Sequence, residues 1–176
     1  RIGPDGFAHQ MVIQPRMAFG TGHHETTRGL LSEMADMDWK GLRVLDMGCG
    51  SGVLGIYAAM RGASEVLFVD IDPWSVRNTR ENVALNGFSE GPSMKIQEGG
   101  ASVLGPEDAR HFDVVIANIN RNILIEDMEA YAASMKDQSV LMLSGFMAPD
   151  VDFLVEKGEA LGLNQSALRA EGEWRV

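Results

Sequence analysis

The sequence predicts an α/β fold, in which helices flank a doubly wound, mostly parallel sheet. Three observations lead to this fold class. From Gly41 onward, short β-branched runs alternate with helical stretches, which is the pattern of a chain built from βαβ units. The run Glu65–Asp70 is almost continuously apolar, as in strands that are buried on both faces. A glycine-rich turn, Asp46–Gly52, joins one predicted strand to the following helix.

Local signals place the other elements. Asp72 is a natural N-cap, Pro73 suits the first position of a helix, and Gly87 ends that helix after Asn86. The other expected strands are Arg43–Asp46, Met94–Glu98, Asp113–Ala117 and Ser139–Ser144; the other expected helices are Thr27–Met37, Val53–Arg61, Asn122–Met135 and one from Pro149 or Asp150 to Leu161. We expect residues 164–176 to hold one strand and the start of another. We also expect one domain, with residues 1–40 as an N-terminal segment and residues 41–176 as a ligand-binding core.

Composition narrows the class of protein. A chain of 176 residues with 45% hydrophobic and 23% charged residues suits one globular domain. It has no apolar run of about 20 residues and no signal-peptide pattern, so we expect neither a membrane span nor secretion. The single cysteine, Cys49, excludes an internal disulfide and suits the cytoplasm. Because Arg1 to Pro4 read as the interior of a longer protein, we expect an upstream domain.

Charge and residue types also bear on partners. The formal net charge of -10 disfavours a nucleic-acid partner, since phosphate binding needs clustered lysines and arginines. A basic protein or an amine substrate suits such a surface better. Four histidines and one cysteine without ligand-like spacing predict no metal site.

The glycine turn has the spacing Gly48, Gly50, Gly52, and the position three after Gly50 is Val53. The dinucleotide fingerprint requires a glycine there. Close backbone approach at Gly48 and Gly50, with Asp46 nearby for an α-ammonium, favours a sulfonium-bearing amino-acid cofactor without a pyrophosphate. A turn that binds no cofactor and a turn that binds a dinucleotide remain alternatives.

Asp70 ends the second predicted strand, 22 positions after Gly48. In nucleoside-binding α/β folds a carboxylate about 20 residues past the glycine motif accepts hydrogen bonds from ribose hydroxyls. We therefore assign Asp70 to a ribose and Asp72 to capping the next helix. The alternative is that Asp70 is an ordinary carboxylate at the end of a strand.

The motif order now resembles that of class I S-adenosylmethionine methyltransferases: Asp46-x-Gly-x-Gly-x-Gly, then Val69-Asp70-Ile71-Asp72-Pro73, then Ala117-Asn118-Ile119. The block Met17-Ala18-Phe19-Gly20-Thr21-Gly22-His23-His24-Glu25-Thr26-Thr27-Arg28, with the late Glu171-Gly172-Glu173-Trp174, is similar to the ribosomal protein L11 methyltransferases. The resemblance covers nearly the whole chain. It implies a Rossmann-like sheet of the seven-stranded type. It also implies an N-terminal docking domain and a closing hairpin, which we expect to be cut short because only Arg175 and Val176 follow Trp174.

The resemblance also implies functional residues. Cofactor binding falls on Thr27, Gly48, Asp70 and Asn118. From the residues themselves we add Gly50, and we expect Phe19 and Thr21 to lie in a loop that covers the cofactor. Asn118 is the expected catalytic residue: its amide oxygen or neighbouring carbonyls accept from the substrate amine and orient it, although Asn118 could instead stabilise a turn. His24 or Glu25 as a proton acceptor is a weaker hypothesis.

The implied activity is methyl transfer from S-adenosylmethionine to lysine ε-amines, the α-amine, or both, of ribosomal protein L11. Enzymes that methylate glutamine or adenine carry an Asn-Pro-Pro-Tyr type of motif, whereas this chain has Asn118-Ile119-Asn120-Arg121. Methylation of another amine, an amide or a small molecule remains an alternative, as does a cofactor-binding module without substrate docking. The sequence leaves the oligomeric state and the number of methyl groups open.

Overall fold

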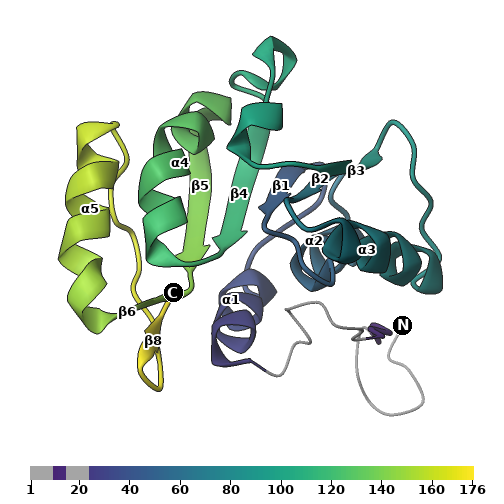
Figure 1. The fold of residues 1–176 in the computed structure, drawn as a ribbon, viewed down its shortest axis with the longest axis horizontal. Coiled ribbons are helices and arrows are strands. Elements are labelled where there is room, and N and C mark those ends of the chain that lie inside the picture. The colour runs from purple at the N-terminus through teal and green to yellow at the C-terminus, as the bar shows by residue number, and fades with distance from the viewer. Residues whose placement is uncertain (1–9, 15–23) are drawn as a thin grey trace.

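The computed structural model describes residues 10–14 and 24–176. Its central sheet has five parallel strands in the order β3-β2-β1-β4-β5, visible in Figure 1. The strands are β1 (Arg43–Met47), β2 (Glu65–Asp70), β3 (Met94–Glu98), β4 (Phe112–Asn118) and β5 (Met135–Ser144). The helices are α1 (Glu25–Ala35), α2 (Val53–Met60), α3 (Pro73–Leu85), α4 (Arg121–Ser134) and α5 (Val151–Ala160), with short 3-10 turns at Ala101–Val103, Pro106–Asp108 and Ala148–Asp150.

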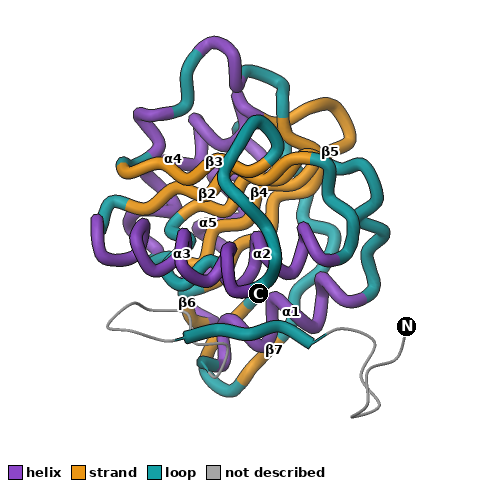
Figure 2. Tube along the Cα trace, turned by 90° about the vertical axis from the view of Figure 1, so that its right-hand side faces the viewer, coloured by secondary structure: helices purple, strands orange, loops and turns teal. Residues whose placement is uncertain are grey.

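Two apolar clusters place the helices on opposite faces of the sheet. Because side chains alternate along a strand, Val44 of β1 packs in the cluster with α1, α2 and α3, whereas Leu45 packs in the cluster with α4 and α5. In the side view of Figure 2 the strands form a layer with α2 and α3 on one side. The doubly wound α/β fold predicted from the sequence is confirmed.

The strand number departs from the seven-stranded expectation. In the described residues the parallel sheet has five strands, and β6 (Phe146–Met147), β7 (Ala170–Glu171) and β8 (Trp174–Arg175) form a separate antiparallel sheet in the order β6-β8-β7. The chain leaves β5 at Gly145, whose φ is +95°, so β6 turns away from the main sheet. The two strands expected near the end of the chain are therefore present as β7 and β8, and β8 also pairs with β6.

Element boundaries agree closely with the sequence reading, except at β5. This strand begins at Met135, directly after α4 ends at Ser134, whereas the sequence indicated Ser139. Gln138 within it has φ +62°, and the pairing with β4 shifts register between Phe112 and Val114. Because of this irregularity, polar and apolar residues do not alternate regularly in the first half of β5, and the sequence pattern therefore did not predict it.

Candidate functional site

Three of the predicted residues come together because their strands are neighbours. β1 pairs with β2 on one side and with β4 on the other, all parallel, so their carboxyl ends share one edge. The glycine turn follows β1, Asp70 ends β2 and Asn118 ends β4. The chain winds outward from β1 in both directions, and such switch points are where open α/β sheets bind ligands.

The glycine turn adopts a backbone that favours glycine. Gly48, Gly50 and Gly52 have φ values of +67°, +56° and +78°. The N–H groups of Gly48 and Cys49 donate to the Val69 carbonyl, at 2.8 and 3.0 Å. A Cβ at Gly48 would lie 2.2 Å from Cγ2 of Ile119. Only glycine therefore lets the turn pass this close to the loop after β4.

The same loop is clamped from its other side. A Cβ at Gly145 would lie 2.3 Å from the carbonyl oxygen of Ile119, and Gly145 also has a positive φ, +95°. Asn118 itself pairs with Ser144 across β4 and β5. The backbone that carries Asn118 is thus held between two glycine-bearing turns.

Two polar side chains of α3 hold the glycine turn from behind. Thr79 Oγ1 donates to the Gly50 carbonyl at 2.9 Å, and Asn82 Nδ2 donates to the Ser51 carbonyl at 2.9 Å. Both side chains are fully buried, where an unbonded polar group would be costly. Sequence reasoning missed these residues. The available signal was that Ser75, Asn78, Thr79 and Asn82 recur at helical spacing on one face of α3, and all four are buried.

Asp70 bridges β2 and the turn. One carboxylate oxygen, Oδ2, accepts from the Gly50 N–H at 2.8 Å, and the other accepts from the Asp72 N–H at 2.9 Å. Asp72 accepts from the N–H groups of Trp74 and Ser75, so its predicted role as a helix cap is confirmed. That Asp70 binds a ribose stays a prediction. Its carboxylate is half-buried and already lies against the turn.

Asp46 has a different environment from the one its sequence position suggested. It is 1% exposed, and its Oδ2 accepts from the Gly55 N–H at 2.9 Å. It thereby caps α2, whose N-cap residue Gly52 has no side chain to do so. Burial raises the pKa of Asp46 to about 7, against the lowering effect of that hydrogen bond and with a smaller raising effect from Asp70.

Thr27 and Asn118, 91 positions apart in the sequence, are hydrogen-bonded. Asn118 Nδ2 donates to Thr27 Oγ1 at 3.3 Å. Thr27 is 1% exposed and Asn118 is half-buried. Because the amide nitrogen is committed to Thr27, the amide oxygen points elsewhere, and it has no hydrogen-bond partner among the described residues.

The block that carries the family resemblance is only partly described. Phe19 and Thr21 lie outside the described residues. His24 is the N-cap of α1: its Nδ1 accepts from the Thr26 N–H at 3.4 Å and lies 2.9 Å from Thr26 Oγ1. Its ring also meets the edge of Trp174, with centroids 5.4 Å apart. These contacts give His24 a structural role in starting the helix that carries Thr27.

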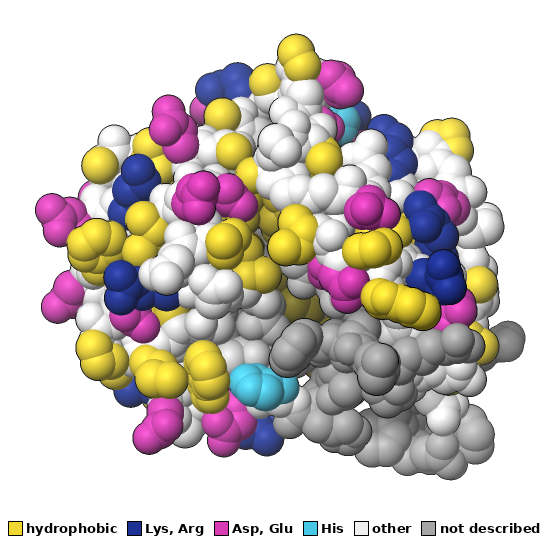
Figure 3. Space-filling model, viewed as in Figure 1, with side chains coloured by type: hydrophobic (Ala, Val, Ile, Leu, Met, Phe, Trp, Pro, Cys, Tyr) yellow, Lys and Arg dark blue, Asp and Glu magenta, His cyan; other side chains and the backbone are white. Residues whose placement is uncertain are grey.

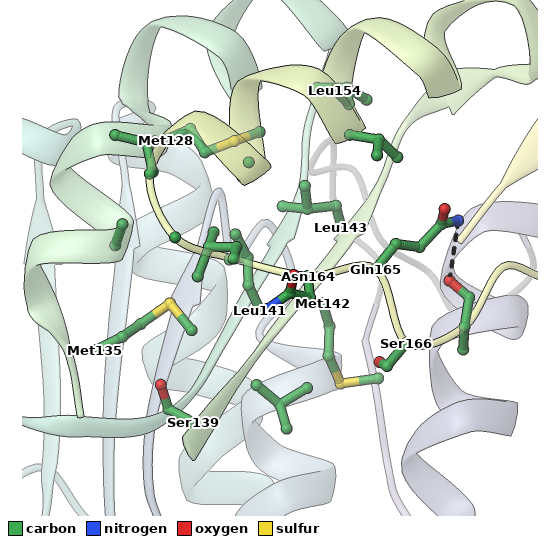
Figure 4. A pocket seen from close by; sticks show the side chains of 18 of the residues that line it. Met128, Met135, Ser139, Leu141, Met142, Leu143, Leu154, Asn164, Gln165 and Ser166 are labelled. Carbon is green, nitrogen blue, oxygen red and sulfur yellow. Dashed lines mark hydrogen bonds between the residues drawn. The ribbon is translucent and has the colours of Figure 1, made fainter. Parts of the chain in front are cut away.

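The structure also contains a cavity of about 860 Å³, shown in Figure 4. It lies along β5, beneath α4, α5 and the chain that follows α5, and apolar side chains such as Met128, Leu141, Leu143 and Leu154 line it. Neither the glycine turn, Asp70 nor Asn118 borders it. The cavity therefore belongs to the edge of the sheet, not to the candidate site.

Among the residues that the structure describes, no three or more His, Cys, Asp or Glu side chains are grouped so that they could hold a metal ion. In residues 10–14 and 24–176, no helix is both long and apolar enough to cross a membrane.

Comparison with known proteins gives consistent results. The family model described as "Ribosomal protein L11 methyltransferase (PrmA)" matches residues 7–176. Curated proteins of that name are similar to this chain: one from Porphyromonas gingivalis is 50% identical and one from Phocaeicola vulgatus is 46% identical, each over 94% of this chain. The chain covers 55% and 57% of those proteins, a little over half of their length.

Solved structures extend the comparison. The ribosomal protein L11 methylase of Lactobacillus delbrueckii subsp. bulgaricus is 28% identical with a TM-score of 0.79, and the match covers 90% of this chain and 78% of that one. A putative RNA methyltransferase from Pyrococcus horikoshii shares the fold at 20% identity, with a TM-score of 0.68 over 92% of this chain and 81% of that one. The two structures differ in the substrate that their names give, so the shared fold does not identify a substrate.

Proposed function

We propose that this chain, which belongs to the ribosomal protein L11 methyltransferase family, binds S-adenosylmethionine and transfers its methyl group to amines of ribosomal protein L11. The supporting observation is that the glycine turn, Asp70 and Asn118 meet at one edge of the sheet, in a chain matched by the family over residues 7–176. The proposal extends to lysine ε-amines, the α-amine, or both, and to the cytoplasm as the place of action.

The residues present fit the cofactor. Gly48 and Gly50 have no side chains to cover the backbone of the turn where it leads into α2, and both have positive φ values. Asp70 offers carboxylate lone pairs beside the turn, suited to ribose hydroxyls. Ile71, next to Asp70, is 74% exposed, an apolar surface that the sequence reading did not single out. When bound, S-adenosylmethionine supplies a methyl group on a positively charged sulfur that departs as a neutral thioether.

The residues of the chain then have to present a neutral amine. At pH 7, deprotonation costs about 5 kcal/mol for a lysine and about 1 kcal/mol for an α-amine. Asn118 cannot take the proton, but its free amide oxygen can accept an N–H of the neutral amine and so aim the nitrogen lone pair. Positioning of this kind supplies much of the rate in a displacement reaction. The hydrogen bond from Asn118 Nδ2 to Thr27 holds the amide in place beside the turn, and we propose that Phe19 and Thr21 take part in binding the cofactor.

A binding measurement tests the cofactor assignment. We expect isothermal titration calorimetry to show S-adenosylmethionine binding without added metal, weakened at least a hundredfold by Asp70→Ala. The matched control Asp72→Ala should weaken binding much less, because Asp72 caps α3. Equal losses in the two variants, or binding of NAD in place of S-adenosylmethionine, would contradict the assignment.

A transfer measurement tests the substrate. Labelled S-adenosylmethionine and purified ribosomal protein L11 should give label in the protein, on amine nitrogens located by mass spectrometry. We expect Asn118→Ala to bind the cofactor yet transfer at least tenfold more slowly. Label in RNA or in free amino acids, and none in the ribosomal protein, would refute the proposed substrate.

A further inference from the structure

Six residues linked by contacts, here called the rim, run from the start of α4, which follows Asn118, to the start of α1, which carries Thr27: Arg121, Phe153, Asp150, Met147, Trp174 and His24. Arg121 Nη1 lies 3.1 Å from Asp150 Oδ1, and the Arg121 guanidinium lies over the Phe153 ring at 5.7 Å. Asp150 Oδ2 accepts from the Met147 N–H at 3.1 Å. Arg121 thus contacts both Phe153 and Asp150, and Asp150 contacts Met147.

The other end of the rim returns to Asn118. Met147 pairs with Trp174 between β6 and β8, and Trp174 meets the ring of His24. His24 starts α1, the helix from which Thr27 reaches Asn118. Arg121 starts α4, the helix that follows Asn118. The chain of contacts therefore runs from the helix that follows Asn118 to the helix whose Thr27 is hydrogen-bonded to Asn118.

The rim exposes apolar surface. Met147 is 43% exposed and Phe153 is 54% exposed, and Ile123, on the first turn of α4, is 37% exposed. These are three of the nine exposed large hydrophobic side chains among the described residues. Figure 3 shows hydrophobic side chains gathered with acidic ones at the lower left of the molecule. Apolar side chains that gather in this way, rimmed by polar ones, are typical of interaction surfaces.

The charge that remains on this surface is negative. Arg28 is paired with Glu171, and Arg121 with Asp150. Asp152 and Glu173 are exposed, and neither has an ion-pair partner among the described residues. Arg175, next to Trp174, also has no carboxylate partner among the described residues. Its guanidinium donates to the backbone carbonyls of Gly172 and Trp174. A cationic segment is therefore attracted to this surface.

We propose that the rim is the docking surface for the stretch of substrate polypeptide on either side of the amine that is methylated. This inference rests on the proposed function and adds where the substrate lies. The occupant is a lysine-bearing segment with apolar neighbours: its amine reaches Asn118, its apolar side chains cover Met147 and Phe153, and its positive charge faces Asp152 and Glu173. An isolated amine would gain nothing from Phe153.

Paired variants test the docking surface. In Met147→Ser/Phe153→Ser we expect the KM for ribosomal protein L11 to rise at least tenfold, with the cofactor Kd unchanged as a check of folding. Leu85→Ser/Val140→Ser removes two apolar side chains of similar exposure, 45% and 40%, outside the rim, and should leave that KM unchanged. Equal effects of the two pairs would overturn the proposal.

A second measurement separates docking from activity. With ¹³C-methyl methionine labelling, titration with ribosomal protein L11 should shift the Met147 signal and leave that of Met60, at the end of α2, in place. If the wild-type chain transfers no methyl group but Met147 shifts, the proposed function fails and the docking surface stands. If transfer occurs without a Met147 shift, docking is elsewhere. Sedimentation as a dimer that Met147→Ser/Phe153→Ser dissociates would make a second copy the occupant and refute the proposal.

Discussion

At the carboxyl ends of β1, β2 and β4, buried polar atoms bond to one another, whereas along β5 apolar side chains line a cavity of about 860 Å³. The first region is tightly packed, because Gly48 and Gly145 both pack against Ile119. The second has room, because β5 pairs on one side only. A large apolar cavity is the usual first guess for a binding site. In this molecule the candidate site is indicated by the polar residues that meet at the ends of three strands. The cavity instead marks the edge of the sheet, where β5 has no partner strand on its outer side.

Gly48→Ala should give the largest effect, because it inserts an atom where the structure has no room. The new Cβ would lie 2.2 Å from Ile119 Cγ2 at a φ of +67°, which L-residues adopt at a cost. We expect S-adenosylmethionine affinity to fall at least a hundredfold by calorimetry. Affinity within threefold of wild type would show that the turn is as tolerant as the cavity.

Asp46→Asn tests the electrostatic cost of a buried carboxyl group at this end. The folded pKa of about 7 exceeds the ordinary value of 3.8, so the folded state holds the proton more tightly than the unfolded state. The free energy of unfolding of the wild type therefore declines as pH rises from about 4 to 7. Asparagine has no such titration and can still accept from the Gly55 N–H.

We expect urea titrations to show that, from pH 4 to pH 8, the free energy of unfolding of Asp46→Asn rises relative to that of the wild type by up to a few kcal/mol. A difference between variant and wild type that does not change with pH would contradict the raised pKa of Asp46.

Thr27→Val removes the hydroxyl that orients the Asn118 amide. With cofactor saturating, we expect kcat to fall about tenfold, the scale of one lost hydrogen bond. Thr27→Ser should restore it. Thr26→Val, which alters the neighbouring buried threonine at the cap, is the matched control and should leave kcat nearly unchanged. If Thr27 acts only by touching the cofactor, Kd will rise and kcat at saturation will stay constant.

Gly158→Ala tests the cavity wall and should have the smallest effect. Gly158 lies in α5, and an added Cβ would sit 3.7 Å from Leu163 Cβ and 3.9 Å from Met128 Sδ, which are ordinary contacts. Because alanine is the better helix former, we expect a gain of up to about 1 kcal/mol in the free energy of unfolding. A loss in denaturant titrations would show that the cavity region is as tightly packed as the glycine turn.

Local chemistry made much of the fold predictable. Asp72 and Pro73 located the start of α3 because capping depends on adjacent residues. β2 was recognisable because a strand buried on both faces is apolar throughout. The pairing of β8 with β6 was not predictable, since it depends on the turn at Gly145 and on contacts between distant segments.

The candidate site divides in the same way. The glycine turn, Asp70 and Asn118 were found because each follows a strand, and parallel strands bring such residues to one edge. The bond from Asn118 to Thr27 and the support from Thr79 and Asn82 depend on how α1 and α3 pack, and no local pattern encodes that packing. Asp46 was placed correctly beside the turn, but its burial, and hence its capping of α2, depends on the whole core.

The position of Ile119 between Gly48 and Gly145 has a consequence for how this sequence can change. Residues in direct contact have non-additive effects, so a substitution at Gly48 should cost less once the side chain at 119 is smaller, whereas a substitution at Gly145 meets the Ile119 backbone and gains nothing from that change. Gly48 and Ile119, far apart in the chain, therefore form a mutational pair, and Ile119→Ala is the step that makes room for a side chain at position 48.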